Sequence, residues 1–177
     1  MLHLPMESHE GNRLGQGALT LAMSKAEFQR TLQDALDSIP HVTGINNHMG
    51  SLLTRDPTAM RWVMSAIRDD GLFFIDSRTT KRTVAAKVAK RNLIRFASRS
   101  VFLDNHPDQD AIHRQLQKLI RKARKTGMAI GIGHPHPQTI QVLAREIPRL
   151  QAQGVDLVPV SELTNDGSIL WHASSSP

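Results

Sequence analysis

The sequence predicts an α/β fold with a parallel sheet, and three observations support this prediction. Short apolar runs alternate about five times with stretches whose apolar residues recur at helical spacing. The run Leu72–Ile75 is apolar throughout, as in a parallel strand that is covered on both faces. Polar residues follow several of these runs, at the position where parallel α/β proteins carry their functional side chains.

Start and stop signals mark the expected helices. Ser24–Glu27 has the pattern of a capping box, and the helix that follows it ends at Pro40. Asp56-Pro57 is typical of an N-cap and a first helical residue, and Gly71 closes that second helix. Further helices are expected over Thr83–Arg91, from Asp108 or Asp110 to Gly127, and over Pro137–Gln151.

Short strands are expected at Leu2–Leu4, Val42–Ile45, Leu72–Ile75, Ser100–Leu103, Met128–Ile132 and Val155–Val160. The chain begins inside the first of them, so we expect amino-terminal βα units of the fold to be absent from this sequence. By its length the chain is one domain, over residues 1–163. The Ser- and Asn-rich residues 164–177 are expected to form a flexible tail.

Composition narrows the function classes. Hydrophobic residues at 40% and charged residues at 21% fit an ordinary globular protein, and no apolar run approaches the roughly 20 residues of a membrane span. No signal peptide is recognisable after Met1. The chain has no cysteine, which excludes disulfides and thiolate zinc sites. Any metal must therefore be held by His, Asp or Glu, a set that suits zinc or a similar divalent ion.

The net charge of +6 raises the question of an anionic partner such as nucleic acid. The chain has no Tyr, two Trp and five Phe, too few rings for a platform that stacks single-stranded bases. The basic residues concentrate in Arg78–Arg99 and His113–Lys125. A solvated basic surface, with no nucleic-acid partner, is the favoured interpretation.

Four polar junctions carry the candidate functional residues. They contain His3 in Leu2–Glu7; Asn46, Asn47, His48 and Ser51 in Gly44–Ser51; Asp76 and Arg78 in Phe73–Arg78; and His134 and His136 in Gly131–Pro137. Histidine at three of the four junctions suggests one shared site.

Each candidate also has a purely structural interpretation. His3 and His48 can satisfy buried backbone groups instead of binding a metal, and Asn46 and Asn47 can close a turn instead of contacting a sugar. Asp76 can cap a helix start, and Arg78 can be a solvated cation. His134-Pro135-His136-Pro137 can be a rigid loop that opens the next helix.

Together, the four motifs in this order resemble the divergent polysaccharide deacetylase family, a distant branch of the NodB-type carbohydrate esterases. The resemblance extends from Leu2 to about Leu163 and implies a distorted (β/α) barrel. It also implies a metal-dependent hydrolase that removes acyl groups from an envelope carbohydrate, with zinc the expected metal and the bacterial periplasm or envelope the expected location.

The resemblance assigns a role to each candidate. His3 and His48 are the expected metal ligands, and His134 the general acid, with His136 as a possible stand-in and Asp76 as the residue that orients it. The expected substrate-binding residues are Asn46, Asn47, Ser51 and Arg78.

The sequence departs from the family pattern in two places. Glu7 stands where family esterases carry their second histidine, and the strand that ends in Ile-Asp-Asp, with its aspartate ligand, is missing. We therefore expect an N-terminally truncated barrel whose exposed sheet edge promotes self-association. The alternative function is a catalytically impaired carbohydrate-binding or envelope-associated protein of the same fold.

Overall fold

The computed structural model describes residues 1–9, 11 and 14–164. The chain folds into two compact units, Met1–Ser98 together with Thr164, and Arg99–Leu163, and each is described by itself. The single domain expected over residues 1–163 stays a prediction, and the expected flexible tail lies, from residue 165, outside the described residues. No described helix is both long and apolar enough to cross a membrane.

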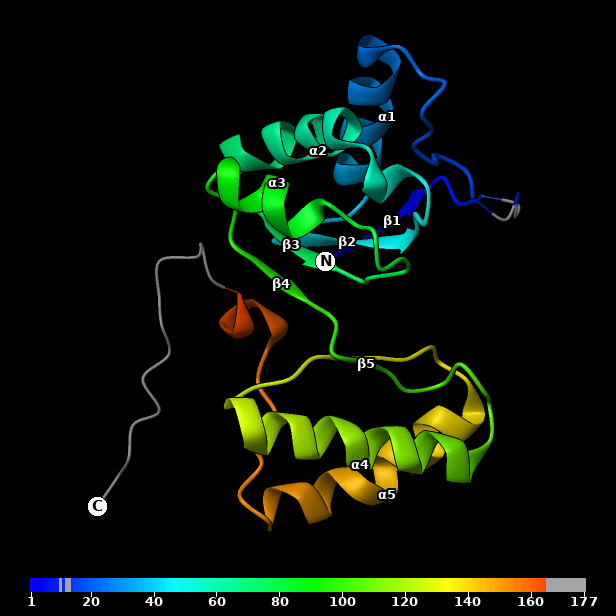
Figure 1. The fold of residues 1–177 in the computed structure, drawn as a ribbon, viewed down its shortest axis with the longest axis vertical. Coiled ribbons are helices and arrows are strands. Elements are labelled where there is room, and N and C mark those ends of the chain that lie inside the picture. The colour runs from blue at the N-terminus through cyan, green and yellow to red at the C-terminus, as the bar shows by residue number, and fades with distance from the viewer. Residues whose placement is uncertain (10, 12–13, 165–177) are drawn as a thin grey trace. The chain divides into compact units, whose positions relative to one another are not determined.

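The first unit contains a parallel sheet with three helices on one of its faces (Figure 1). Within the described residues the strand order is β1-β2-β3-β4, and every pairing is parallel. Because this order follows the chain, successive right-handed crossovers place their helices on the same face. The elements are β1 (Leu2–Met6), α1 (Lys25–Asp37), β2 (Gly44–Met49), the 3-10 turn η1 (Leu53–Arg55), α2 (Pro57–Asp69), β3 (Phe73–Asp76), α3 (Ala85–Arg91) and β4 (Phe96–Ser98).

The alternation along β1 separates the core from the candidate site. Leu2, Leu4 and Met6 are buried in the cluster that packs against the helices, whereas His3 points to the opposite face and is exposed. In the parallel register His3 lies opposite Asn46, and Pro5 lies opposite His48. The side chains of His3, Asn46 and His48 therefore share the face that the helices leave free.

Both helix-start signals in this unit are confirmed. The Ser24 hydroxyl accepts a hydrogen bond from the Glu27 amide at 3.3 Å, and the Ser24 amide donates to Glu27 Oε2 at 2.8 Å. Asp56 accepts bonds from the amides of the second and third residues of α2, at 2.8 and 2.7 Å, and Pro57 is its first residue. These bonds satisfy amides that have no partner within their helix.

Gly44, the first residue of β2, is expected to tolerate no side chain. A Cβ there would overlap the buried ring of Phe73 on the neighbouring strand. We expect Gly44→Ala to lower the free energy of unfolding by about 1–3 kcal/mol, the usual cost of overpacking. Gly15→Ala is the matched control, because its Cβ would lie 3.8 Å from the Pro5 ring, an ordinary contact. Equal denaturant midpoints for the two variants would contradict the prediction.

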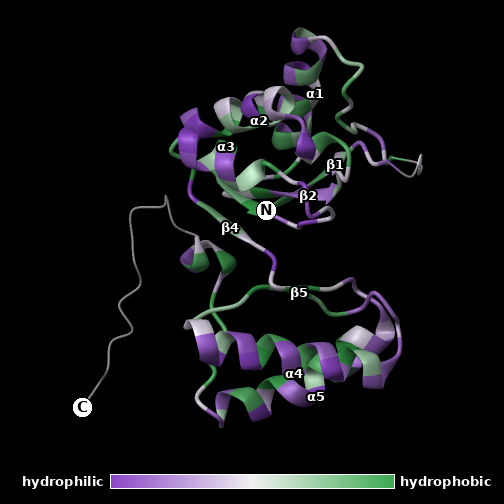
Figure 2. Ribbon diagram, viewed as in Figure 1, coloured by the Kyte–Doolittle hydropathy of each residue, from purple (hydrophilic) through white to green (hydrophobic). Residues whose placement is uncertain are grey.

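The second unit pairs two helices with two short strands. They are β5 (Val101–Phe102), α4 (Gln109–Thr126), β6 (Gly131–Ile132), α5 (Pro137–Gln151) and the 3-10 turn η2 (Val160–Leu163), with β5 and β6 parallel. Figure 2 shows hydrophobic and hydrophilic residues interleaved along α4 and α5. The hydrophobic ones, including Ile112, Leu116, Ile120 and Val142, form the core of this unit. Gly127 ends α4 in the left-handed conformation at φ 81°, which glycine adopts without strain.

The α/β fold with parallel strands is confirmed, but the strand expected at Val155–Val160 is wrong. Residues 155–159 have irregular backbone and lead into η2, and β6 pairs only with β5 among the described strands. Leu157 and Val158 are 54% and 40% exposed. An apolar run forms a strand only beside a partner, and Pro159 has no amide to donate. The structure also contains β4, which the sequence did not predict. Its three residues are too few to show the alternation of apolar and polar side chains that indicates a strand.

Candidate active-site residues

His3 and His48 come together at the free face of the first sheet. His3 Nε2 lies 3.0 Å from His48 Nδ1, and the two ring centroids are 4.8 Å apart. The pair forms because the register sets His48 beside Pro5, two residues beyond His3 on the same face of β1. The two ring nitrogens proposed from the sequence as metal ligands are thus direct neighbours.

Asn46 fixes the orientation and the tautomer of His3. Its Oδ1 lies 3.1 Å from His3 Nδ1, and its Nδ2 donates to the Ser77 hydroxyl at 3.1 Å. Because Oδ1 can only accept, the proton of a neutral His3 ring sits on Nδ1 and its Nε2 carries the lone pair. A carbonyl or carboxylate that holds the far nitrogen in this way is typical of histidines that bind metals.

The spacing of the two rings fits a shared divalent ion. Two nitrogens bound tetrahedrally to zinc at about 2.05 Å lie about 3.3 Å apart, close to the distance between His3 Nε2 and His48 Nδ1. An ion here would replace the proton that now lies between them. Among the described residues, however, this pair belongs to no group of three potential ligands. The first unit therefore fits two ligands of a catalytic zinc site, which usually has three.

Asn47 has the turn-closing role that was one of its two interpretations. Its side chain is only 1% exposed, its Oδ1 accepts from the Ser77 amide at 2.8 Å, and its Nδ2 donates to the Met49 carbonyl at 2.7 Å. Contact with a substrate would require these bonds to break. Ser51 is also buried and accepts a bond from the His9 amide at 2.9 Å, which ties the loop after β2 to the loop after β1.

Asp76 lies at the end of β3 and organises the segment that leads into α3. Its Oδ1 accepts from the Arg78 amide at 2.8 Å, and its Oδ2 accepts from the Thr83 hydroxyl at 3.0 Å. Thr83 in turn accepts from the amide of Ala85, the first residue of α3, at 3.2 Å. Arg78 has a positive φ of 48°, which this turn imposes. These contacts match the helix-start interpretation of Asp76.

The carboxylate bonded to His134 is Asp104, not Asp76. Asp104 follows β5, and its fully buried Oδ1 lies 3.0 Å from His134 Nδ1. Its Oδ2 accepts from the His134 amide and from the Thr139 hydroxyl, the latter at 2.9 Å. The packing leaves little room for a side chain at Gly133, since a Cβ there would lie 3.2 Å from Asp104 Oδ2. The orienting role expected of Asp76 is thus filled by a residue that the sequence analysis did not select.

The hydrogen bonds keep Asp104 ionised. Burial is the largest single influence and acts to raise its pKa, but the bonds from the His134 amide, the His134 ring and Thr139 together outweigh burial. The pKa of Asp104 is therefore lowered from its ordinary value of 3.8. An ionised Asp104 holds the proton of His134 on Nδ1 and leaves Nε2 on a side chain that is 52% exposed.

His136 completes the only group of three potential metal ligands among the described residues, with Asp104 and His134. Its ring centroid lies 5.7 Å from that of His134, and it is the N-cap residue of α5. Asp104 Oδ1 accepts one hydrogen bond and Oδ2 accepts two, so one lone pair of Oδ1 remains for an ion. The three residues therefore fit either a proton-transfer pair, through the bond between His134 Nδ1 and Asp104, or a metal site.

One signal could have identified Asp104 from the sequence. Leu103-Asp104-Asn105-His106 is a polar junction directly after an expected strand, the same pattern that selected the other four. The partner of Asp104, His134, lies 30 residues further along the chain. Parallel pairing of β5 with β6 brings the two residues together, and this pairing was not predicted.

The fold and these side chains define an α/β protein with a histidine pair on the free face of β1 and β2 and a carboxylate–histidine pair just past the parallel strands β5 and β6. The chain belongs to the divergent polysaccharide deacetylase family, whose profile matches residues 1–164.

Two curated relatives and one solved structure illustrate the family. An uncharacterized protein of Haemophilus influenzae is 36% identical over 170 residues, and the match covers 96% of this chain and 60% of the relative. The uncharacterized protein YibQ of Escherichia coli K12 is 36% identical over 169 residues, with 96% and 53% covered. The chain thus spans little more than half the length of these relatives. The crystal structure of an uncharacterized protein from Agrobacterium tumefaciens C58 superposes with a TM-score of 0.89 at 25% identity, covering 92% of this chain and 67% of that one.

Proposed function

We propose that this chain is part of a hydrolase that removes acyl groups from an envelope carbohydrate. The observation that carries the proposal is the pair formed by Asp104 and His134. A buried, ionised carboxylate holds the imidazole through Nδ1, and the exposed Nε2 has no hydrogen-bond partner among the described residues. This is the arrangement that a general acid or base requires, because imidazole changes its charge near neutral pH.

In this proposal His134 donates a proton through Nε2 to the leaving amine or alcohol as the acyl group departs. Asp104 acts as a positioning residue, because it touches His134 and not the substrate. Its bond from His134 Nδ1 fixes the orientation of the ring, and its bonds from the His134 amide and the Thr139 hydroxyl hold the carboxylate in place. His136 lies close enough to His134 to contact the same leaving group.

His3 and His48 supply the second part of the proposal, as two ligands of a divalent ion, with zinc the expected metal. Such an ion lowers the pKa of a bound water to about 7 and polarises the acyl carbonyl. Asn46 keeps the His3 lone pair on Nε2, where a ligand needs it. Of the four residues expected to contact the carbohydrate, the exposed Arg78 keeps that role in the proposal, whereas Asn46, Asn47 and Ser51 are buried and position the loops around the site. The carbohydrate substrate and the envelope location rest on the family alone.

A second candidate function is carbohydrate binding without turnover. It is favoured by the histidine pair of the first unit, which lacks a third ligand among the described residues. With two ligands an ion would bind weakly, and no strong nucleophile would form at neutral pH. The protein would then keep the polar loop surface of an esterase without its activity.

The distinguishing experiment measures acetate release and glycan binding in parallel. The full chain is incubated with N-acetylated and O-acetylated oligosaccharides, with and without added zinc. We expect zinc-dependent acetate release that is lost in His134→Ala and kept in His106→Ala. His106 is the control because it is two residues from Asp104 and its ring makes no hydrogen bond to any residue that the structure describes. Glycan binding with no acetate release would support the binding protein and overturn the hydrolase.

A further inference from the structure

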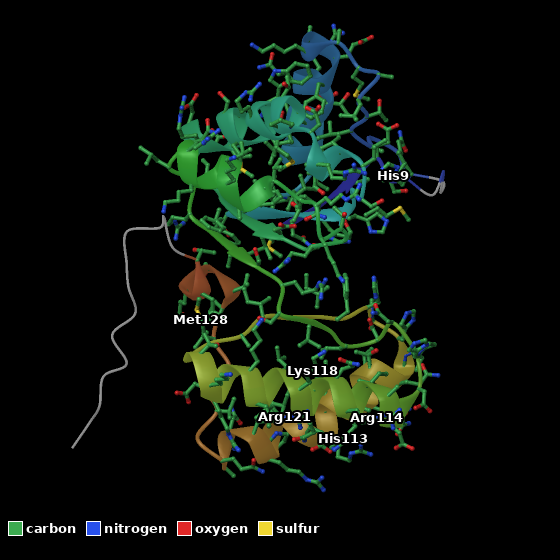
Figure 3. The ribbon with its side chains drawn as sticks, in the orientation of Figure 1. His9, His113, Arg114, Lys118, Arg121 and Met128 are labelled. Atoms are coloured by element: carbon green, nitrogen blue, oxygen red, sulfur yellow. The ribbon has the colours of Figure 1, made fainter. Side chains whose placement is uncertain are left out.

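Helix α4 carries most of the net charge of the protein on its exposed side. Six cationic side chains and one acidic side chain give its 18 residues a net charge of +5, compared with +6 for the whole chain. Four of the cations, at spacings of four, three and four residues, define a basic stripe: Arg114, Lys118, Arg121 and Lys125. At 100° per residue these four project within about 60° of one another and extend over about 16 Å. Figure 3 labels the first three along α4.

The basic stripe has no counterions within the part of the chain that the structure describes. Its four residues are exposed, and none of them forms an ion pair or a side-chain hydrogen bond there. Glu146 on the neighbouring helix α5 is paired with Arg145, Arg149 and His113. Asp110, the only acidic residue of α4, makes no ion pair with Arg114.

Folding does not explain this arrangement. Like charges three or four residues apart destabilise a helix, and the stripe contains three such successive pairs. Lys125 is accounted for by the negative end of the helix dipole, but Arg114, Lys118 and Arg121 lie before the last turn. The uncompensated cations therefore indicate an external anionic surface.

The shape of the stripe indicates what kind of surface that is. The opposite side of α4, with Ile112, Leu116 and Ile120, is buried in the core, so α4 cannot rotate to insert apolar residues. No aromatic residue lies on α4, which leaves nothing to stack on exposed bases. Helix α5 packs alongside α4, joined by Gln109–Gln141 and His113–Glu146 contacts, and would obstruct entry into a DNA groove about 12 Å wide. A straight line of cations on a flanked helix fits a planar array of phosphates.

We propose that the basic stripe of α4 docks the protein on a membrane surface rich in acidic phospholipids. Contact is electrostatic and superficial, through the headgroup phosphates. The proposal is independent of the proposed hydrolase activity, because the basic stripe uses none of the candidate active-site residues. It would place the candidate active-site residues of the second unit close to a bilayer surface.

The test is co-sedimentation of the full chain with vesicles. The vesicles contain either phosphatidylglycerol mixed with phosphatidylcholine or phosphatidylcholine alone. We expect binding only to the acidic vesicles, with affinity falling steeply between low and physiological salt. Each cation near an acidic surface strengthens binding about fivefold, so replacing all four by glutamine should weaken it roughly 10²- to 10³-fold.

The matched control removes four exposed cations from helices of the first unit and leaves the same net charge. Its substitutions are Lys25→Gln, Lys87→Gln, Lys90→Gln and Arg91→Gln. Binding that falls equally in both quadruple variants would overturn the basic stripe as the site, as would binding insensitive to salt. If duplex DNA or an acidic polysaccharide binds more tightly than the acidic vesicles, the surface belongs to that polymer and the proposal fails. If the stripe variant does not fold, Lys118→Gln with Arg121→Gln replaces it, with an expected loss of roughly 10- to 30-fold.

Discussion

Replacing His134 by alanine is expected to lower acyl hydrolysis by about 10²- to 10⁴-fold, the usual contribution of a positioned general acid. Replacing Asp104 by asparagine is expected to lower it by about 10- to 100-fold, because the ring remains but loses its orienting charge. Asparagine has nearly the volume of aspartate, and alanine is smaller than histidine. Neither variant therefore crowds the site. The measurement is the initial rate of acetate release, with His106→Ala as the control.

The double variant decides whether the two residues act as one unit. If Asp104 acts only through His134, adding Asp104→Asn to His134→Ala should cause no further loss of rate. If the two losses instead multiply, Asp104 has another role and the proposed pair is wrong.

Stability against pH tests the same carboxylate without any assay of activity. The pKa of Asp104 is lower in the folded protein than its ordinary value of 3.8. A lowered pKa means that the ionised form is stabilised by folding, so this contribution is fully present above the ordinary value. It is lost as the pH falls below 3.8 and through the pKa of the folded state. At neutral pH we expect Asp104→Asn to cost about 1–3 kcal/mol of unfolding free energy, from the weakened bonds of a buried acceptor.

Thermal melts of the native protein and of Asp104→Asn should therefore converge as the solution is acidified. A difference in melting temperature that stays constant between neutral pH and pH 3 would show that the carboxylate is not ionised in the fold. Thr139→Val removes one of the bonds that lower the pKa of Asp104, so its melts should converge with those of the native protein in the same direction but by a smaller amount.

The parts of the fold that the sequence predicted are those with local causes. Ser24 and Asp56 cap their helices through amides two or three residues away, so the signal and the structure lie within one turn. Leu72–Ile75 was recognised because burial on both faces leaves a continuous apolar run. The errors concern elements with distant causes. Val155–Val160 has the apolar content of a strand, yet a strand depends on a neighbour that no local pattern supplies.

The candidate residues divide in the same way. Polar residues beside apolar runs drew attention to His3, His48 and His134, although His3 and His48 lie within β1 and β2 and only His134 follows its strand. Their partners were harder to infer, since Asp76 and Asp104 both follow strands and only pairing in space distinguishes them. The strand register, which joins His3 to Asn46 across 43 positions, decides which side chains touch. Sequence reasoning therefore identified the kind of site more reliably than the contacts within it.

Zinc binding is expected to depend on His3 and His48 and not on His134 and His136. The native chain should bind zinc in isothermal titration calorimetry, and the hydrogen on His48 Nδ1 would move to Nε2 of the same ring when Nδ1 binds the ion. Replacing both His3 and His48 by alanine should abolish this heat. Asn46→Ala should weaken the affinity by about 10- to 100-fold, since Asn46 fixes the tautomer of His3.

The matched control replaces His134 and His136 by alanine, which removes two potential ligands from the other group and should leave zinc binding unchanged. Thermal stability provides an independent readout. Zinc at 100 times its dissociation constant stabilises a folded protein by about 2.7 kcal/mol, so the melting temperature should rise in the native chain and in this control. It should not rise in the variant without His3 and His48. If the two double variants behave in the opposite way, the ion binds in the second unit. His134 would then be a metal ligand, and the proton transfer assigned to it would be wrong.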